Sequence, residues 1–264
     1  MKFNMNFSSQ KISARTICLS FVLCMLSLIS TGCANQQQQE KQSETLKDRA
    51  RAHTDLGAVY FQQKQYEIAL DEFTLASKID PSFASAFNGL GLVNAALGKD
   101  DVADADFRKS IQIEPMNSEA RNNYGSFLCA RNRIDESITE FLAAVKNPLY
   151  ATPAMAYTNA AICSMRKKDM ASAEAYLQRA LQIEPLSQAA AYQMANIQFK
   201  RNDAVAAKKT LQNVMLGQVG PEILWLAIQI ERAVGARDAE ASYSLELRRK
   251  YPDSEQVKLL QGGK

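Results

Sequence analysis

The chain has 264 residues, 47% of them hydrophobic, which is enough to bury a substantial core in one or two domains. Three of its 31 basic residues (Lys2, Lys11 and Arg15) precede residue 33, and the other 28 balance the 28 acidic residues, so the body has no formal net charge. A neutral body without a basic stripe lacks the charge that neutralises phosphates, which argues against DNA or RNA as a partner.

The first 32 residues have the organisation of an export signal. They contain positive charges and no acidic residue, then an apolar run from Ile17 to Ile29, then small residues before Cys33. The apolar run is shorter than the roughly 20 residues of a membrane-spanning helix, so we interpret residues 1–32 as a signal peptide. The junction resembles a bacterial lipobox, with Ser30 where leucine is usual, and this resemblance implies lipidation of Cys33. An ordinary signal peptide with a chance cysteine is the alternative.

Residues 33–49 are predicted to tether the lipid to the folded domain. The segment is polar and rich in glutamine, so it cannot bury apolar surface and is expected to be flexible. The lipobox-type modification supplies several acyl chains, and two or more chains hold a protein stably to a membrane. The residue after Cys33 is Ala34, whereas an aspartate at this position would resemble an inner-membrane retention signal. We therefore expect a lipid-anchored protein of the outer membrane that faces the periplasm.

A repeat of 34 residues runs through the rest of the chain. The segment KIDPSFASAFNGLG around Pro81 returns as QIEPMNSEARNNYG around Pro115, and a third copy surrounds Pro185. Proline fits the start of a helix and not its interior, so each copy marks a junction between two helices. A 34-residue helix-turn-helix unit is the tetratricopeptide (TPR) repeat. The first repeat carries the TPR pattern most fully, in Leu56, Gly57, Tyr60, Ala69, Phe73, Ala76 and Pro81.

We predict an all-α TPR solenoid for residues 50–264, with about six helix-turn-helix repeats that form a right-handed superhelix with a concave groove. The sixth repeat is degenerate, as expected for a terminal unit with one face in water. The segment Asn147–Tyr150 replaces the usual junction after the third repeat and adds two residues. The alternative, a plain helical bundle with accidental periodicity, is disfavoured by three junctions in matching register. Six repeats leave no room for a catalytic domain.

No constellation of reactive residues points to an enzyme, a metal site or a cofactor. The single histidine, His53, occupies a packing position of the first repeat. Asp100, Asp101 and Asp104 lie at the start of an expected helix, where carboxylates satisfy free amide groups and the helix dipole. Trp225 is read as a core residue of the sixth repeat. We therefore predict a protein-binding function without catalysis, cofactor, metal or small-molecule substrate.

Two cysteines remain after the signal and the lipidated residue are set aside. Cys129 and Cys163 lie in the first helices of repeats three and four, which run side by side in a TPR stack. Because the periplasm is oxidising, a disulfide between them is our hypothesis, and two buried free thiols are the alternative.

Several segments of the mature chain resemble the PilF/PilW family of type IV pilus biogenesis lipoproteins. They are the run Asn122–Cys129, the insertion Asn147–Tyr150, the segment Asn159–Cys163 and the closing stretch Ser242–Pro252. The resemblance implies a pilotin, a lipid-anchored protein that binds secretin subunits and promotes their localisation to the outer membrane and their multimerisation there. The alternative is another periplasmic TPR lipoprotein, one that scaffolds outer-membrane protein insertion or cell-wall synthesis.

The position of each residue within its repeat predicts which side chains line the concave groove. Asparagines at the fifth position could bond a peptide backbone, and apolar neighbours could offer pockets, although any of these side chains could instead complete the packing between repeats. The absence of a repeated Lys/Arg clamp favours an extended or helical segment with apolar anchors over a free carboxyl terminus. The predicted groove residues are Arg51, Thr54, Ala58, Phe61, Asn88, Leu92, Asn122, Ser126, Thr158, Ile162 and Met165.

Overall fold

The structure is a computed structural model that describes residues 41–262. The predicted signal peptide, Cys33 and the tether as far as residue 40 lie outside this range. Within it, every regular element is a helix, in agreement with the predicted all-α class. None of the helices in this part of the chain has the length and apolar character needed to cross a bilayer.

The helices of residues 41–262 form six consecutive pairs, as the sequence predicts. A short 3-10 helix, η1 (Val214–Leu216), follows the fifth pair, and α13 (Glu255–Gly262) follows the sixth. The pairs are 41–62 with α2 (Tyr66–Ile79), α3 (Ala84–Ala96) with α4 (Asp100–Ile113), α5 (Ser118–Ala130) with α6 (Ile134–Ala144), α7 (Pro153–Arg166) with α8 (Met170–Ile183), α9 (Gln188–Lys200) with α10 (Ala204–Leu211), and α11 (Pro221–Ala233) with α12 (Arg237–Lys250).

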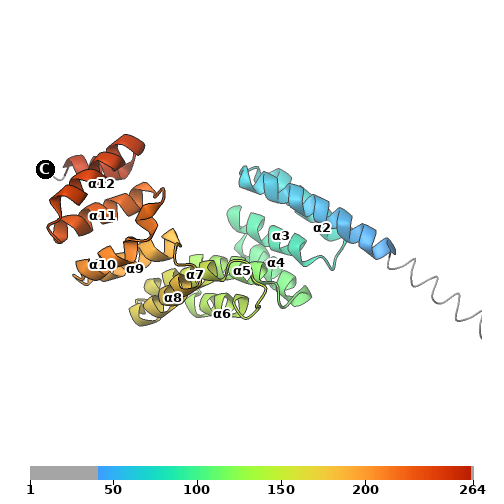
Figure 1. Ribbon diagram of the computed structural model, residues 1–264. Coiled ribbons are helices and arrows are strands. Elements are labelled where there is room, and N and C mark those ends of the chain that lie inside the picture. Colours follow the sequence, from blue (N-terminus) through green and yellow to red (C-terminus); the bar gives the residue numbers. More distant parts are fainter. Residues whose placement is uncertain (1–40, 263–264) are drawn as a thin grey trace, which may run out of the picture.

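The pairs stack into an arc, which Figure 1 shows from the blue first helix to the red α12. In the middle of the arc, α5 and α7 lie on the inner side, and α6 and α8 lie on the outer side. Each first helix from α3 to α9 also contacts the first helix of the next pair. We call the first helix of each pair the inner helix and the second the outer helix.

The first helix begins earlier than predicted. Residues 41–49, which the sequence assigned to the flexible tether, are helical and continuous with the first inner helix. The stretch contains good helix formers such as Glu44, Leu46 and Lys47, and the Thr45 hydroxyl donates to the carbonyl of Lys41 at 2.8 Å. Polarity alone suggested a linker, but a polar segment that continues a packed helix can itself be helical. The boundary at residue 50 was therefore placed too late.

Small residues let the two helices of a pair approach closely. A Cβ atom built on Gly125 of α5 would lie 2.8 Å from the ring of Phe141 in α6, which is fully enclosed. Side chains cannot approach this closely, so only glycine allows the ring to sit against the inner helix. The same relation holds for Gly91 with Phe107 in the second pair and for Gly57 with Phe73 in the first.

The turn inside each pair contains one residue in the left-handed region. This residue falls at the same place in every repeat, and glycine fills it only in the second and sixth pairs. The φ angles lie between 61° and 76° at Lys64, Gly98, Asn132, Lys168, Asn202 and Gly235. The recurrence shows that the turns of all six repeats have the same backbone conformation, although their sequences differ.

The sixth pair packs fully despite its weak sequence pattern. Leu224 and Ile228 of α11 and Leu247 of α12 are completely buried, and Trp225 packs partly buried against the same core. Val257 of α13 covers the end of this core with 4% exposure. The final helix thus closes the apolar end of the stack.

Candidate partner-binding groove

Three hollows lie on the inner helices. The first has a volume of about 220 Å³ and is lined by the inner helices of repeats one to three. The second has a volume of about 540 Å³ and is lined by the starts of α5 and α7 and the junction between α6 and α7, and the third, of about 220 Å³, is lined by the later halves of α5 and α7. Together they form what we call the groove.

Seven of the eleven predicted groove residues line these hollows. Thr54, Ala58, Asn88 and Leu92 line the first hollow, Asn122 the second, and Ser126 and Ile162 the third. The register of the repeat therefore places most of the predicted side chains on the hollowed face.

The other four predicted residues make different contacts. Arg51 is exposed and pairs with Asp48 at 3.7 Å, and the ring of Phe61 packs on Tyr66 with 5.5 Å between centroids. Thr158 is buried and donates to the carbonyl of Ala154 at 2.8 Å. Met165 is partly buried and packs against the core of the fourth repeat.

The asparagines of the inner helices bond to one another as well as lining the groove. Asn123 donates through Nδ2 to Oδ1 of Asn88 at 3.2 Å, and Asn159 donates in the same way to Asn122 at 3.1 Å. Asn88 and Asn122 are only 8% and 4% exposed, so the main role of their amides is to connect neighbouring repeats. The prediction that they are open to a peptide backbone overlooked this pairing, which becomes visible only when neighbouring repeats are stacked.

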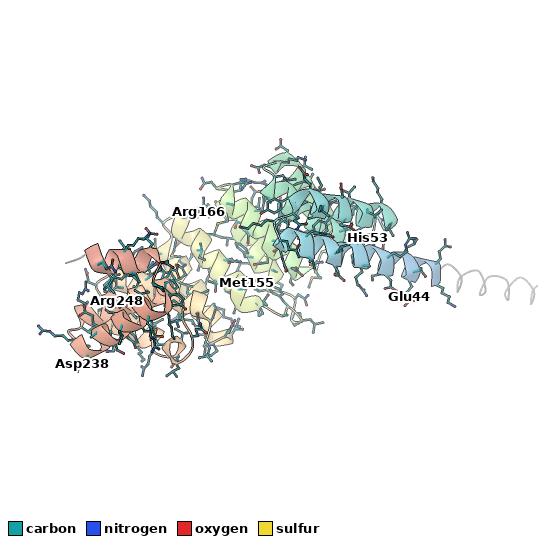
Figure 2. The ribbon with its side chains drawn as sticks, turned by 90° about the horizontal axis from the view of Figure 1, so that it is seen from above. Glu44, His53, Met155, Arg166, Asp238 and Arg248 are labelled. Carbon is teal, nitrogen blue, oxygen red and sulfur yellow. A yellow bond between two sulfur atoms is a disulfide. The ribbon has the colours of Figure 1, made fainter. Side chains whose placement is uncertain are left out.

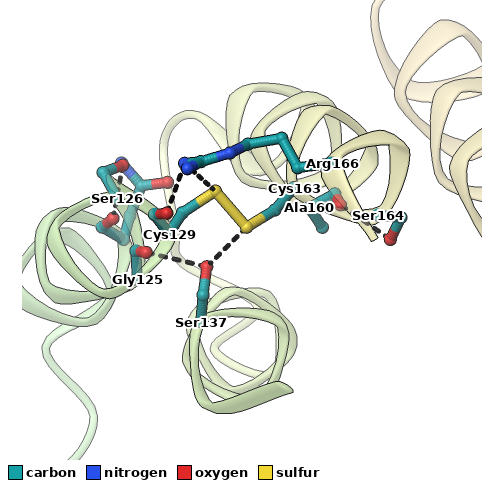
Figure 3. Close-up of a disulfide and its surroundings, with 9 residues drawn as sticks. Gly125, Ser126, Cys129, Ser137, Ala160, Cys163, Ser164 and Arg166 are labelled. Atoms are coloured by element: carbon teal, nitrogen blue, oxygen red, sulfur yellow. Dashed lines mark hydrogen bonds between the residues drawn. A yellow bond between two sulfur atoms is a disulfide. The ribbon is translucent and has the colours of Figure 1, made fainter. Parts of the chain in front are cut away.

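A disulfide joins α5 and α7 on the wall of the third hollow. Figure 3 shows the bond between Cys129 and Cys163, whose sulfur atoms are 2.10 Å apart and whose Cα atoms are 5.9 Å apart. The Ser137 hydroxyl lies 3.3 Å from Sγ of Cys163, and Arg166 donates to the carbonyl of Cys129. The bond fixes two neighbouring inner helices beside the third hollow.

Two of the aspartates at the start of α4 are held by arginines, Asp100 by Arg131 and Asp104 by Arg108 and Arg133. Asp104 accepts hydrogen bonds from Arg108, Arg133 and the hydroxyl of Tyr124, and these bonds outweigh the effect of burial and lower the pKa of its carboxyl group. Burial, with the bond to Asp104, raises the pKa of Tyr124 to about 12. These bonds connect repeat two to repeat three. No group of three potential ligands suitable for a metal ion occurs within residues 41–262.

The single histidine connects two helices of the first repeat. Nδ1 of His53 lies 2.7 Å from a carboxylate oxygen of Glu72, and this contact joins the first inner helix to α2.

Some of the groove was missed by reasoning from repeat positions. Met116 lies in the junction before α5, and Leu149 lies in the insertion before α7; both line the second hollow and are 56% and 88% exposed. The repeat pattern assigns no inner face to junction residues. The two-residue insertion was the available signal that this junction has a shape of its own.

Paired helices that repeat every 34 residues, stacked so that the inner helices present a hollowed face, define a TPR protein-interaction scaffold. Two family models match the chain, "TPR repeat" over residues 57–98 and "Tetratricopeptide repeat" over residues 164–226. The chain belongs to the PilF/PilW family of type IV pilus TPR proteins. It is 30% identical over 235 residues to the type IV pilus assembly protein PilF of Pseudomonas aeruginosa, covering 87% of this chain and 92% of the relative.

Two solved structures have the same architecture. A crystal structure of PilW, described as a widely conserved type IV pilus biogenesis factor, has a TM-score of 0.68 and 29% identity, covering 80% of this chain and 98% of the other. The structure of Pseudomonas aeruginosa PilF has a TM-score of 0.70 and 30% identity, covering 83% of this chain and 99% of the other.

A more distant sequence relative is an uncharacterized protein of Haemophilus influenzae. It is 21% identical over 170 residues, covering 64% of this chain and 93% of the relative.

Proposed function

We propose that this chain is a lipid-anchored assembly factor of type IV pili. It binds secretin subunits through its inner face and promotes their localisation to the outer membrane and their multimerisation there. The observation that carries the proposal is a continuous hollowed face across repeats one to four, in a chain that matches a pilus assembly protein over nearly its whole length. A role in pilus biogenesis follows from the family, and the secretin is the specific partner proposed.

The groove favours a binding role over a catalytic one. Its lining consists of amides, apolar side chains and a few charges, and several of its polar groups are occupied in joining repeats. An extended surface of this kind, formed by stacked repeats, is what solenoid proteins use to hold partner segments. The chain therefore acts by positioning another protein.

The lipid anchor is the part of the proposal that rests on the sequence alone. A lipidated Cys33 would hold the domain at the outer membrane with its repeats in the periplasm. Secretin subunits bound in the groove would then be delivered to the membrane in which they assemble.

The fate of the secretin in a strain that lacks this chain tests the function. Heat-resistant secretin multimers and their membrane fraction are followed on gels, with total monomer as the control. We expect multimers to disappear, or to remain at the inner membrane, while monomer is still made. Multimers of normal amount and location in the deletion strain would remove the secretin from the proposal.

A Cys33→Ala chain, returned to the deletion strain, separates anchoring from binding. If the lipid delivers the secretin, multimers form in reduced amount or in the inner-membrane fraction, although the TPR domain is produced. Full restoration by Cys33→Ala would contradict the anchoring step and leave the binding step intact.

The deletion strain also separates this function from that of a general envelope scaffold. Loss of pili with a normal cell wall and porin profile in that strain favours the pilus function.

A further inference from the structure

The first two hollows of the groove form one continuous surface. Asn117 and Glu119, at the start of α5, line both of them. A segment lying across repeats one to four along this face would therefore pass Glu119 on its way between the two hollows.

All charged side chains that line this surface are acidic. Asp55 lines the first hollow, Glu114 the second, and Glu119 both, whereas no lysine or arginine lines either of them. Within residues 41–262, neither Asp55 nor Glu119 takes part in an ion pair, in contrast to Asp104. Carboxylates of one sign in a recess with low-dielectric walls concentrate their field and attract cations.

Exposed apolar side chains gather beside these carboxylates in the second hollow. Met116, Leu149 and Met155 are 56%, 88% and 47% exposed, and they come from the junction before α5, the insertion before α7 and the start of α7. Figure 2 shows Met155 and Arg166 at opposite ends of α7, so the basic residue lies with the third hollow and away from the apolar group. Large apolar side chains brought together at the surface mark a contact site for another protein.

We propose that the first two hollows hold a basic, apolar segment of the partner protein, with lysine or arginine side chains opposite Asp55 and Glu119 and an apolar side chain against Met116, Leu149 and Met155. The inference rests on the proposed binding function and specifies the chemistry of the partner segment. Complementary charge sets orientation and rate of association, and the apolar contact supplies affinity.

The probe is a pair of labelled synthetic peptides with blocked ends. Each is about twelve residues long, which spans roughly 40 Å when extended. One alternates lysine with leucine, and the other has glutamate in place of every lysine. Binding to the purified mature protein is measured by fluorescence anisotropy at several salt concentrations. The lysine peptide is expected to bind at least tenfold more tightly, with an affinity that falls as salt rises.

Matched variants test the position of the site. Asp55→Asn with Glu119→Gln should weaken binding of the lysine peptide by about threefold to tenfold, because each carboxylate is an exposed ion-pair partner. The control, Asp71→Asn with Asp238→Asn, removes the same charge from exposed positions of α2 and α12 and should leave the affinity unchanged. Equal binding of both peptides, or equal losses in the two double variants, would overturn the proposal.

Two further outcomes are distinguishable. A dimer that sedimentation detects, and that the Asp55→Asn, Glu119→Gln variant dissociates, would assign the surface to a second copy of the chain and overturn the proposal. The same variant is also returned to the deletion strain. Normal secretin multimers there would contradict the basic-segment inference and leave the proposed function standing, whereas normal multimers in the deletion strain itself would contradict the function alone.

Discussion

At the scale of single residues, Asp104 is a partly buried carboxylate that connects two repeats. It accepts hydrogen bonds from Arg108, Arg133 and the hydroxyl of Tyr124. Arg133 and Tyr124 belong to the next repeat, and the distance along the chain conceals them. The repeat pattern places the carboxylate on a helix, and the stacking of repeats brings its partners to it.

The Asp104 bonds predict a dependence of stability on pH. Asp104→Asn should lower the free energy of unfolding at pH 7 by about 1–3 kcal/mol, the usual contribution of hydrogen bonds to a charged group. Because the folded-state pKa is lowered, the carboxylate stabilises the fold above its unfolded pKa of about 3.9, and this contribution is lost as the pH falls through the folded pKa.

Denaturant unfolding at a series of pH values measures this effect. The variant should lose less stability than the parent between pH 5 and pH 2. Asp101→Asn is the matched control, since its exposed side chain lies in the same turn. Identical pH profiles for the parent and Asp104→Asn would contradict the assigned role.

The left-handed turn residues make a second prediction at this scale. Lys64 and Lys168 adopt φ angles of 61° and 64°, a region that disfavours residues with a Cβ atom. Lys168→Gly should therefore stabilise the protein slightly, by about 0.5 kcal/mol after the entropy of glycine in the unfolded chain is subtracted. Gly98→Ala, at φ 73°, should destabilise it by about 1 kcal/mol.

Thermal unfolding of the two variants checks this pair of opposite changes. The midpoint should rise for Lys168→Gly and fall for Gly98→Ala. A fall in both midpoints would mean that a contact of the Lys168 side chain stabilises the protein by more than its left-handed backbone conformation costs.

At the scale of elements, the helix pairs were predictable because each is encoded by a pattern that returns with a fixed period. Prolines mark the junctions, and the Gly125–Phe141 contact follows from a small residue opposite a bulky one. The second hollow was not predictable in the same way, because Leu149 lies in an insertion outside the period and Met116 lies between helices, where the repeat pattern assigns no inner face. The burial of Asn88 and Asn122 depends on how closely neighbouring inner helices approach, which no single repeat specifies.

The disulfide gives a prediction for the inner helices. A bond that closes a loop over a sequence separation of 34 removes conformational entropy from the unfolded chain, and its loss in Cys129→Ala, Cys163→Ala should cost about 3–4 kcal/mol of unfolding free energy. Thiol labelling of the denatured, unreduced protein should leave both cysteines unmodified, and the same labelling after reduction should modify both. Labelling of both without reduction would show two free thiols instead.

At the scale of the whole molecule, the arc determines what the protein can hold. Each repeat contributes only a few inner side chains, and the succession of repeats one to four joins the first two hollows into a surface long enough for a partner segment. The sequence predicted a concave groove, and seven of the eleven predicted residues line the hollows, while their contact with a partner stays a prediction. The acidic and apolar character of this surface emerged from residues on three inner helices and two junctions that are far apart in the chain.

The central claim is that the inner face binds the pilus secretin, and site-specific photo-crosslinking in living cells tests it most directly. A photoreactive residue replaces Ser126, which lines the third hollow, or Ser85, which lines the first. In matched strains it replaces Thr139 or Asp71, which are exposed on the outer helices α6 and α2. We predict that the secretin crosslinks to Ser126 and Ser85 positions and not to the outer ones. Crosslinks that form only from the outer helices, or no secretin crosslink from the groove while pili are still assembled, would contradict the account.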